Sequence, residues 1–268
     1  MNPFSHIGVF DPKNKLFDGG RLITVGATAG QGKSLCINTL ILNYIDKGVD
    51  VLLFTENTRN SYAGMQQTIE DMTFEKSRKF DAGILYMCPV VFENPVEYFI
   101  NQLNAFIPFH NHYLGSFAIV IDGDMFTAEN RSFDFLTIGP NTRVVLTEKI
   151  NKNIKPNVYR FEISKDYDKP SKVRVKNLAF LNLAQKYNAH IIFSTQLINN
   201  DSPLTRVYGN TPFIVDMYIR AKRDMNKFNN FAIDFIKNRF GNEKTYICEM
   251  DQTNLTLVEK AKKDIIEV

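Results

Sequence analysis

Cysteine is scarce in this sequence, and no part of it is apolar enough to cross a membrane. The three cysteines, Cys36, Cys88 and Cys248, lie far apart and lack C-x-x-C spacing, which excludes a closed disulfide framework. We expect them to be reduced, buried core residues of a cytosolic protein. Eighteen apolar residues never come consecutively, and the N-terminal residues contain no basic segment followed by an apolar run. The sequence therefore predicts a cytoplasmic protein that is neither exported nor membrane-spanning.

An excess of charge of one sign is also missing. The formal net charge of +3 is too small to indicate nucleic-acid binding, so local basic clusters must decide that question. The hydrophobic content of 44% and the charged content of 23% are ordinary for a globular protein. No internal repeat or low-complexity linker is visible. We expect residues 1–268 to form a single domain, with residues 1–20 as an N-terminal arm.

Short runs rich in β-branched residues alternate with helical patterns, as they do in βαβ units with a mainly parallel sheet. Predicted strands cover residues 21–27, 49–56, 84–88, 117–122, 190–196, 213–221, 231–238 and 244–250. Predicted helices cover residues 33–47, 60–72, 95–106 and 175–187. Helices separate the first five strands, whereas the last three strands follow one another closely as an antiparallel extension. This order is typical of an α/β protein with a RecA-like core.

The segment 126–172 interrupts this alternation with polar turns and prolines. It contains two short strand patterns, TRVVLTE and NVYRFEIS, and is predicted to be an inserted hairpin. Basic residues outnumber acidic ones here, which makes it the most basic stretch of the chain. The predicted nucleic-acid contacts within it are Lys149, Lys152 and Lys155. The alternative is a solvated loop whose lysines serve only solubility.

The strongest motif is GATAGQGKS at residues 26–34, between a predicted strand and a predicted helix. In such a P-loop, glycines let backbone N–H groups surround phosphates, a lysine reaches the β and γ phosphates, and a hydroxyl ligates Mg²⁺. Lys33 and Ser34 supply the last two groups, so ATP and Mg²⁺ are the expected ligands. The first glycine of the pattern is replaced by Ala27. The predicted nucleotide-binding residues are Ala27, Thr28, Ala29, Gly30, Gln31, Gly32, Lys33 and Ser34.

Carboxylates follow two further predicted strands. FAIVID ends in Asp122, which is predicted to hold the magnesium shell opposite Ser34, with Asp124 as a substitute. VLLFTE ends in Glu56, which could polarise the attacking water as a general base. The alternative for Glu56 is a strand-end residue that faces solvent.

The order of these motifs resembles the C-terminal motor domain of DnaB-type replicative helicases, including related phage primase-helicases. The matching segments are GRLITVGATAGQGKS, VDVLLFTEN, FAIVIDGD, LAFLNLAQKYNAHIIFSTQLINND and LTRVYGNTPFIVDMYI. That family often has alanine where Ala27 stands. The resemblance implies a glutamine that senses the γ-phosphate at Gln196, a DNA-facing loop after it, and a DNA contact at Arg206. It is also compatible with a phage-encoded protein that acts in the host cytoplasm.

The segment FIKNRFG resembles the family's K-x-R motif, in which a lysine and an arginine reach the γ-phosphate of a neighbouring subunit. Carried over, Lys237 and Arg239 form this pair. The alternative is two exposed basic residues on an edge strand. Two features depart from the family: the segment 126–172 is longer than the usual connection, and the short N-terminal arm is expected to leave no room for a collar or primase domain.

Three classes of function remain in competition. The first is an ATP-driven motor on single-stranded DNA, a homo-oligomer expected to be a hexameric ring with shared nucleotide sites, served by a loader or primase partner. The second is a RecA- or KaiC-like ATPase that assembles on DNA or a protein without unwinding. The third, a structural protein that does not hydrolyse nucleotide, is disfavoured because Lys33, Ser34, Glu56 and Asp122 occur together.

Overall fold

The structure is a computed structural model of the chain. The residues that it describes are 19–46, 48–56, 83–91, 93, 95–107, 117–123, 132–138, 143–147, 158–162, 180–181, 183–185, 187–197, 215–239, 244–252 and 256–260.

The centre of the fold is a sheet in which nine described strands are joined in the order β12-β11-β10-β9-β1-β8-β4-β2-β3. The strands are β1 (Arg21–Ala27), β2 (Asp50–Thr55), β3 (Leu85–Pro89), β4 (Phe117–Asp122), β8 (His190–Gln196), β9 (Met217–Arg223), β10 (Asn230–Asn238), β11 (Thr245–Asp251) and β12 (Thr256–Glu259). From β3 to β9 every pairing is parallel. The pairings from β9 to β12 are antiparallel.

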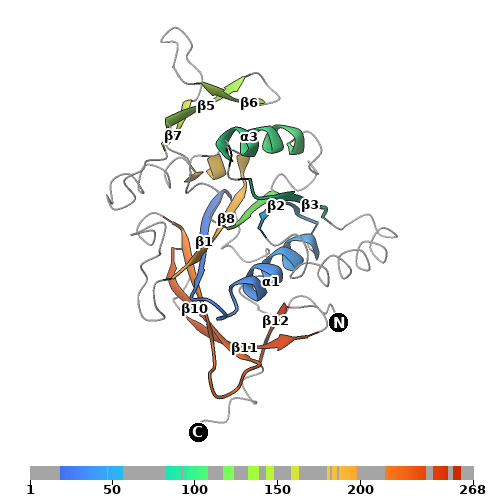
Figure 1. The fold of residues 1–268 in the computed structure, drawn as a ribbon, viewed down its shortest axis with the longest axis vertical. Helices are drawn as coiled ribbons and strands as arrows, with labels where there is room; N and C mark the ends of the chain where they lie inside the picture. The colour runs from blue at the N-terminus through green and yellow to red at the C-terminus, as the bar shows by residue number, and fades with distance from the viewer. Residues whose placement is uncertain are drawn as a thin grey trace.

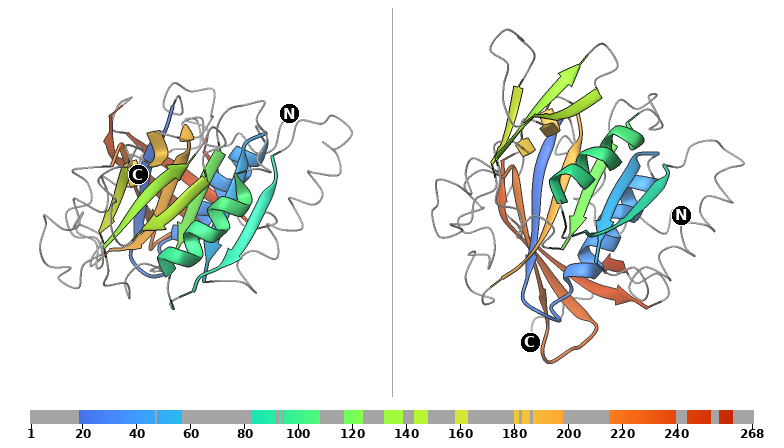
Figure 2. Two further views of the ribbon diagram at one scale, coloured as in Figure 1. Left: turned by 90° about the horizontal axis from the view of Figure 1, so that it is seen from above. Right: turned by 45° about the horizontal axis from the view of Figure 1, so that its top comes forward.

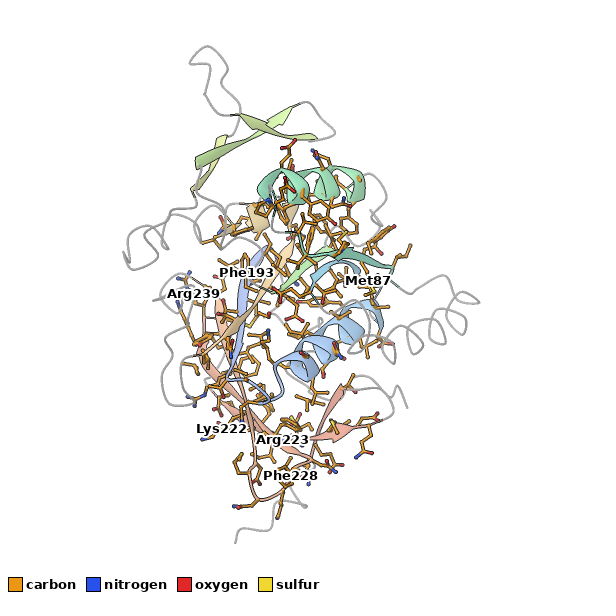
Figure 3. The ribbon with its side chains drawn as sticks, viewed as in Figure 1. Met87, Phe193, Lys222, Arg223, Phe228 and Arg239 are labelled. Carbon is orange, nitrogen blue, oxygen red and sulfur yellow. The ribbon has the colours of Figure 1, made fainter. Side chains whose placement is uncertain are left out.

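Continuous apolar runs become the central parallel strands because both faces of the sheet are covered. Helix α1 (Lys33–Asp46) contacts one face, and helix α3 (Pro95–Phe106) packs on the other face beside the helical residues between 180 and 187. Every residue of β2 and β4 is buried. The α3 side is rich in aromatic rings, among them Phe193, which is labelled in Figure 3. Two hydrophobic cores, one on each face, therefore hold the sheet in place.

The antiparallel strands extend the sheet until its last strand meets α1. The backbone N–H of Leu257 in β12 donates to the Thr39 hydroxyl of α1 at 2.8 Å, in a buried position. Thr256 and Leu257 are buried as well. Figure 1 shows this extension at one end of the long axis of the molecule, away from α3.

A second, three-stranded sheet lies at the other end of the long axis, beyond α3 (Figures 1 and 2). It consists of β5 (Ser132–Ile138), β6 (Arg143–Thr147) and β7 (Val158–Glu162), in the order β6-β5-β7. The predicted hairpin is therefore wrong, because the two predicted strands do not pair with each other. Each pairs antiparallel with β5, a strand that the sequence pattern did not predict.

The main elements otherwise lie close to where the sequence predicts them. The bounds of β1, β4, β8 and α3 agree with the prediction, whereas β9 begins at Met217 and not at residue 213. The predicted helix 60–72 and the start of the helix 175–187 lie outside the described residues. Cys36, Cys88 and Cys248 are free and buried, as predicted, and burial raises the pKa of the Cys248 thiol to about 12. No helix within the described ranges has the length and apolar content needed to cross a bilayer.

Candidate nucleotide site

The P-loop joins the end of β1 to the first turn of α1. Gly30 and Gly32 have φ of +73° and +91°, values that L side chains rarely adopt, so the turn needs glycine at both positions. The Gln31 N–H donates to the Thr28 carbonyl at 3.3 Å, which closes the turn, and α1 then begins at Lys33. The unpaired N–H groups and the positive dipole end of α1 consequently face the loop, an arrangement suited to phosphate.

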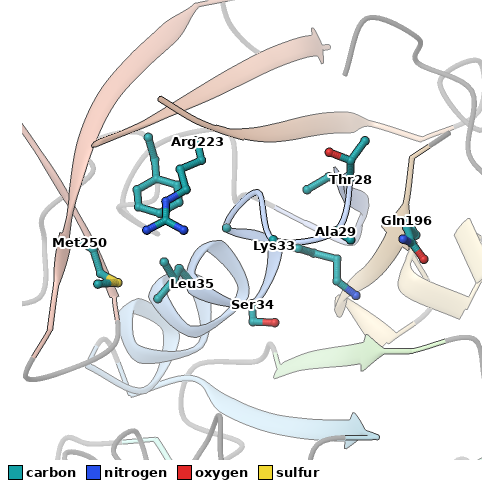
Figure 4. Close-up of a pocket in the computed structure, with 12 residues that line it drawn as sticks. Thr28, Ala29, Lys33, Ser34, Leu35, Gln196, Arg223 and Met250 are labelled. Carbon is teal, nitrogen blue, oxygen red and sulfur yellow. The ribbon is translucent and has the colours of Figure 1, made fainter. Parts of the chain in front are cut away.

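A cavity of about 440 Å³ opens beside this turn (Figure 4). It has the size range of a small-molecule site. Its wall is made of the P-loop, the end of β8 and three residues of the antiparallel extension. The lining residues are Ala27, Thr28, Ala29, Gly30, Gly32, Lys33, Ser34, Leu35, Gln196, Arg223, Phe231 and Met250.

Lys33 and Asp122, 89 residues apart in sequence, meet at this cavity. The Lys33 Nζ lies 3.2 Å from the Asp122 Oδ1 and 3.1 Å from the Ser194 Oγ. The Ser194 hydroxyl in turn donates to the Asp122 Oδ1 at 2.5 Å. Asp122 is almost fully buried, and two donors, one of them charged, compensate its negative charge. Sequence reasoning missed Ser194, because FSTQ gives no sign that its serine reaches another strand.

The oxygen donors here fit a magnesium ion better than a softer metal. Ser34 lines the cavity next to Lys33, whose ammonium touches the Asp122 carboxylate, so a hydroxyl and a carboxylate face the same region. Within the described ranges, no group of three or more His, Cys, Asp or Glu side chains could hold a metal by themselves. A metal at this place would therefore take most of its ligands from phosphate and water, as Mg²⁺ does.

Glu56 lies beside Asp122 at the ends of two paired strands. Its backbone N–H donates to the Asp122 carbonyl at 3.3 Å. Its carboxylate is close to Gly123, where an added Cβ would lie 2.5 Å from the Glu56 Oε1. Gly123 also has a φ of +142°. The glycine after Asp122 is thus explained by the close approach of Glu56, which the sequence alone did not reveal.

Gln196 lies next to the P-loop because β8 and β1 pair in parallel. Gln196 is opposite Ala27 in this pairing, and the Leu197 N–H donates to the Ala27 carbonyl at 2.9 Å. Its side chain lines the cavity (Figure 4). The predicted positions of Ala27 and Gln196 at one site are thus brought together by the sheet register.

The turn between β9 and β10 forms the far wall of the cavity, which the sequence did not predict. The Arg223 N–H donates to the Gln31 Oε1 at 2.8 Å, so the P-loop is bonded to β9. The Arg223 guanidinium lies 5.1 Å from the Phe228 ring centroid and 5.7 Å from that of Phe231. An added Cβ on Gly32 would lie 2.6 Å from the Phe231 ring, so Gly32 is also required by packing. Arg223 and Phe231 supply a cation and an aromatic surface on the side of the cavity away from Asp122.

Lys237 and Arg239 lie at the opposite edge of the sheet from the P-loop of their own chain. The Arg239 guanidinium is 3.4 Å from the buried Asp216 carboxylate, and that carboxylate accepts from the Leu22 N–H at 2.9 Å. Leu22 begins β1 and the P-loop follows its end, so the strand separates the two places by about 17 Å at roughly 3.3 Å per residue. In Figure 3, Arg239 and Arg223 are correspondingly far apart along the β9–β10 ribbon.

The strand β10 carries a register shift between Phe235 and Lys237, just before this basic pair. Such a bulge re-aims the side chains that follow it. Partial burial lowers the pKa of Lys237, the positive charge of Arg239 lowers it further, and Asp216 partly offsets both. The side chain of Arg239 is 44% exposed. A cation with this exposure is accessible to another molecule.

The remaining predicted residues are outside the described part of the chain. They are Asp124, Lys149, Lys152, Lys155 and Arg206.

Comparison with known proteins supports the architecture. No protein-family model matches the chain, and no curated protein sequence matches it. Solved structures do match, among them the ATPase domain of a DnaB-like helicase, with a TM-score of 0.59 and 10% sequence identity. The match covers 91% of this chain and 86% of that chain. At such low identity the likeness shows the fold alone, and it confirms the predicted α/β fold with a RecA-like core and an antiparallel C-terminal extension.

Proposed function

We propose that the chain is an ATP-hydrolysing RecA-like motor that acts on single-stranded DNA, similar to DnaB-type replicative helicases. One observation carries the proposal: the P-loop cavity and the Lys237–Arg239 pair lie at opposite edges of one sheet. The cavity offers what binding of a nucleoside triphosphate needs. The distant pair offers what a second nucleotide site, on a neighbouring subunit, would lack.

In this proposal ATP binds along the P-loop, with its phosphates at the N-terminus of α1. Lys33 leaves Asp122 and Ser194 for the β and γ phosphates. Ser34 and Asp122 would hold Mg²⁺, which neutralises phosphate charge when bound. Arg223 and Phe231, on the opposite wall, can pack against the base.

Glu56 is the proposed general base, because it stands at the strand end beside Asp122. Its carboxylate would accept a proton from the attacking water. Gln196 is the proposed sensor of the γ-phosphate, supported by its place on the cavity wall next to the P-loop. A neutral amide there can donate to phosphate oxygen without taking the proton.

Lys237 and Arg239 are proposed to act on the nucleotide of a neighbouring subunit in a homo-oligomer, a hexameric ring by analogy with the helicase family. Their distance from the P-loop of their own chain supports action in trans. A guanidinium supplied in this way stabilises charge that develops on the transferring phosphoryl group. Asp216 would hold Arg239 until the neighbour arrives.

DNA is proposed to contact the loops that follow Asp122 and Gln196, with Arg206, Lys149, Lys152 and Lys155 on its phosphates. Contacts of this kind are insensitive to sequence and weaken with salt. A loader or primase partner, as in the helicase family, belongs to the same proposal.

The second candidate is a RecA- or KaiC-like ATPase that assembles on DNA or a protein without unwinding. Hydrolysis with and without single-stranded DNA, followed by strand displacement on a forked duplex, separates the two. Stimulated hydrolysis with displacement supports the motor, whereas stimulated hydrolysis and DNA-bound filaments without displacement support the second candidate. A chain that does not hydrolyse ATP under any of these conditions would contradict both.

A further inference from the structure

Ser194 occupies a position in the nucleotide site that none of the roles above uses. Its hydroxyl joins two groups of opposite charge, accepting from the Lys33 Nζ at 3.1 Å and donating to the Asp122 Oδ1 at 2.5 Å. It is 1% exposed. A buried hydroxyl is costly unless it is hydrogen-bonded, and this one makes both bonds with charged partners.

The sheet register delivers Ser194 to this point. Ser194 is opposite Val25 of β1, two residues before the end of that strand, and its neighbour on the same face, Ile192, belongs to the core under α1. Asp122 closes β4, which pairs with β8 on its other side. Ser194 is therefore fixed by two strands, whereas Lys33 approaches on a long, partly exposed side chain.

Resting on the proposed function, we propose that Ser194 is a positioning residue that releases Lys33 for the nucleotide. Asp122 is 5% exposed, and its Oδ1 accepts from both Lys33 and Ser194. When Lys33 moves to the phosphates, Asp122 loses one donor. The Ser194 hydroxyl stays in place and continues to stabilise the carboxylate, which lowers the cost of moving Lys33.

Without the hydroxyl, the buried Asp122 carboxylate would depend more heavily on Lys33. The ion pair would then hold the ammonium more tightly and compete with the phosphates for it. The main effect should be on nucleotide affinity, because the competition takes place before the chemical step. Once nucleotide is bound, Lys33 has already moved.

The test is the affinity of a fluorescent ATP analogue for Ser194→Ala in the presence of Mg²⁺. We expect affinity to fall about tenfold, in line with the loss of a hydrogen bond to a charged group. We expect KM for ATP to rise by a similar factor, with kcat at saturating ATP changed by less than about threefold. Ser194→Thr, which keeps the hydroxyl, should restore most of the affinity.

Thr195→Val is the matched control, since it removes a hydroxyl from the next residue of the same strand. Thr195 is also 1% exposed, and its hydroxyl has no hydrogen-bond partner within the described structure. Its variant should bind nucleotide like the wild type. Equal losses in Thr195→Val and Ser194→Ala would mean that disturbing β8, and not the hydroxyl of Ser194, weakens binding, and would overturn the proposal.

A double-mutant cycle with Asp122→Asn tests whether Ser194 acts through Asp122. Once the charge is removed, Ser194→Ala should reduce affinity by no more than about twofold further. A full additional tenfold loss would show that Ser194 acts independently and would overturn the proposal. If Ser194→Ala melts at much lower temperature, Ser194→Cys, which keeps the size but donates weakly, replaces it in the same cycle.

The outcomes separate this inference from the proposed function. Wild-type hydrolysis together with near-normal nucleotide affinity in Ser194→Ala would overturn the role of Ser194 and leave the ATPase intact. A wild-type chain that binds the analogue without hydrolysing it would contradict the proposed function, while the binding cycle would still decide the role of Ser194. A wild-type chain that binds no nucleotide would overturn both.

Discussion

The two edges of the parallel sheet differ in how their charges are arranged. At the carboxyl ends of the strands, Lys33 and Asp122 are paired beside a cavity and held by Ser194. At the other edge, Arg239 is paired with the buried Asp216, and its side chain is 44% exposed. Both edges thus contain a cation on a buried carboxylate, but only the first pair lies on the wall of the described cavity.

This difference indicates how a single chain could contribute to two sites. A cation paired with a buried carboxylate can be held in place until a better partner, such as phosphate, replaces it. For Lys33 that partner would bind in its own chain. For Arg239 it would have to come from outside, because about 17 Å of β1 lies between Arg239 and the P-loop. The predictions below test whether the two edges work in this way.

The largest effect is expected at the first edge, in Lys33→Ala. The phosphates would lose their main cationic partner, so hydrolysis should fall below detection and nucleotide affinity should drop as well. Phosphate release and binding of a fluorescent ATP analogue measure the two effects. Lys260→Ala, at the end of the antiparallel extension, is a charge-matched control that should leave both unchanged. Residual hydrolysis near the wild-type rate would place the active site elsewhere.

Arg239→Ala tests the second edge. We expect normal nucleotide binding but hydrolysis slower by about 10³ to 10⁵, because the guanidinium stabilises charge that develops only in the transition state. Melting temperature should be recorded alongside, since Asp216 loses one partner but keeps the Leu22 N–H. Loss of nucleotide binding in parallel with hydrolysis would contradict a role confined to the transition state.

Mixing this variant with Lys33→Ala asks whether the two edges meet across a subunit boundary. An Arg239→Ala subunit has an intact P-loop, and a Lys33→Ala subunit has an intact Arg239. Mixed oligomers then contain some interfaces at which both parts are functional, so activity should partly return. Normal hydrolysis by a dilute wild-type monomer would reject the shared site outright.

Glu56→Gln should have a smaller effect, confined to the chemical step. The amide keeps the shape of the side chain but cannot accept the proton from water, so turnover should slow by about 10² to 10⁴ with nucleotide binding retained. Glu97→Gln, an exposed change in the first turn of α3, is the control. Near-normal turnover in Glu56→Gln would remove Glu56 from the site.

The sequence predicted the first edge better than the second. The bounds of β1, β4 and β8 agree with the prediction because strands buried on both faces appear as continuous apolar runs with sharp ends. The residues at those ends, Lys33 and Asp122, therefore fell together. Local patterns were sufficient there.

Long-range contacts explain what the sequence did not predict. Ser194 reaches Lys33 across 161 residues, and Arg223 bonds to Gln31 across 192. No periodicity encodes such pairs. The start of β9 was also misplaced, because Asp216 satisfies Leu22 with its carboxylate as well as its backbone, and the ladder begins only at Met217. Side-chain bonds that replace strand pairing leave no trace in an apolar pattern.

The smallest expected effect concerns the basic segment 126–172, which belongs to neither edge and would extend the comparison to a third region. Replacing Lys149, Lys152 and Lys155 together by alanine should weaken binding to single-stranded DNA of any sequence. Each lost phosphate contact reduces the slope of log affinity against log salt by about 0.7, so three contacts predict a decrease of about 2. Fluorescence anisotropy with a labelled oligonucleotide at several salt concentrations measures this slope.

The control for this experiment must remove the same charge from another region. Lys222, Lys227 and Lys244 are exposed on the antiparallel extension, and their triple alanine variant changes the net charge equally. If the segment 126–172 contacts DNA, its variant should lose much more slope than this control. Equal losses would mean that overall charge alone attracts DNA, and an unchanged slope in the first variant would mean that these lysines face solvent or a protein partner. In either case hydrolysis without DNA should remain at the wild-type rate, because neither set of lysines lines the P-loop cavity.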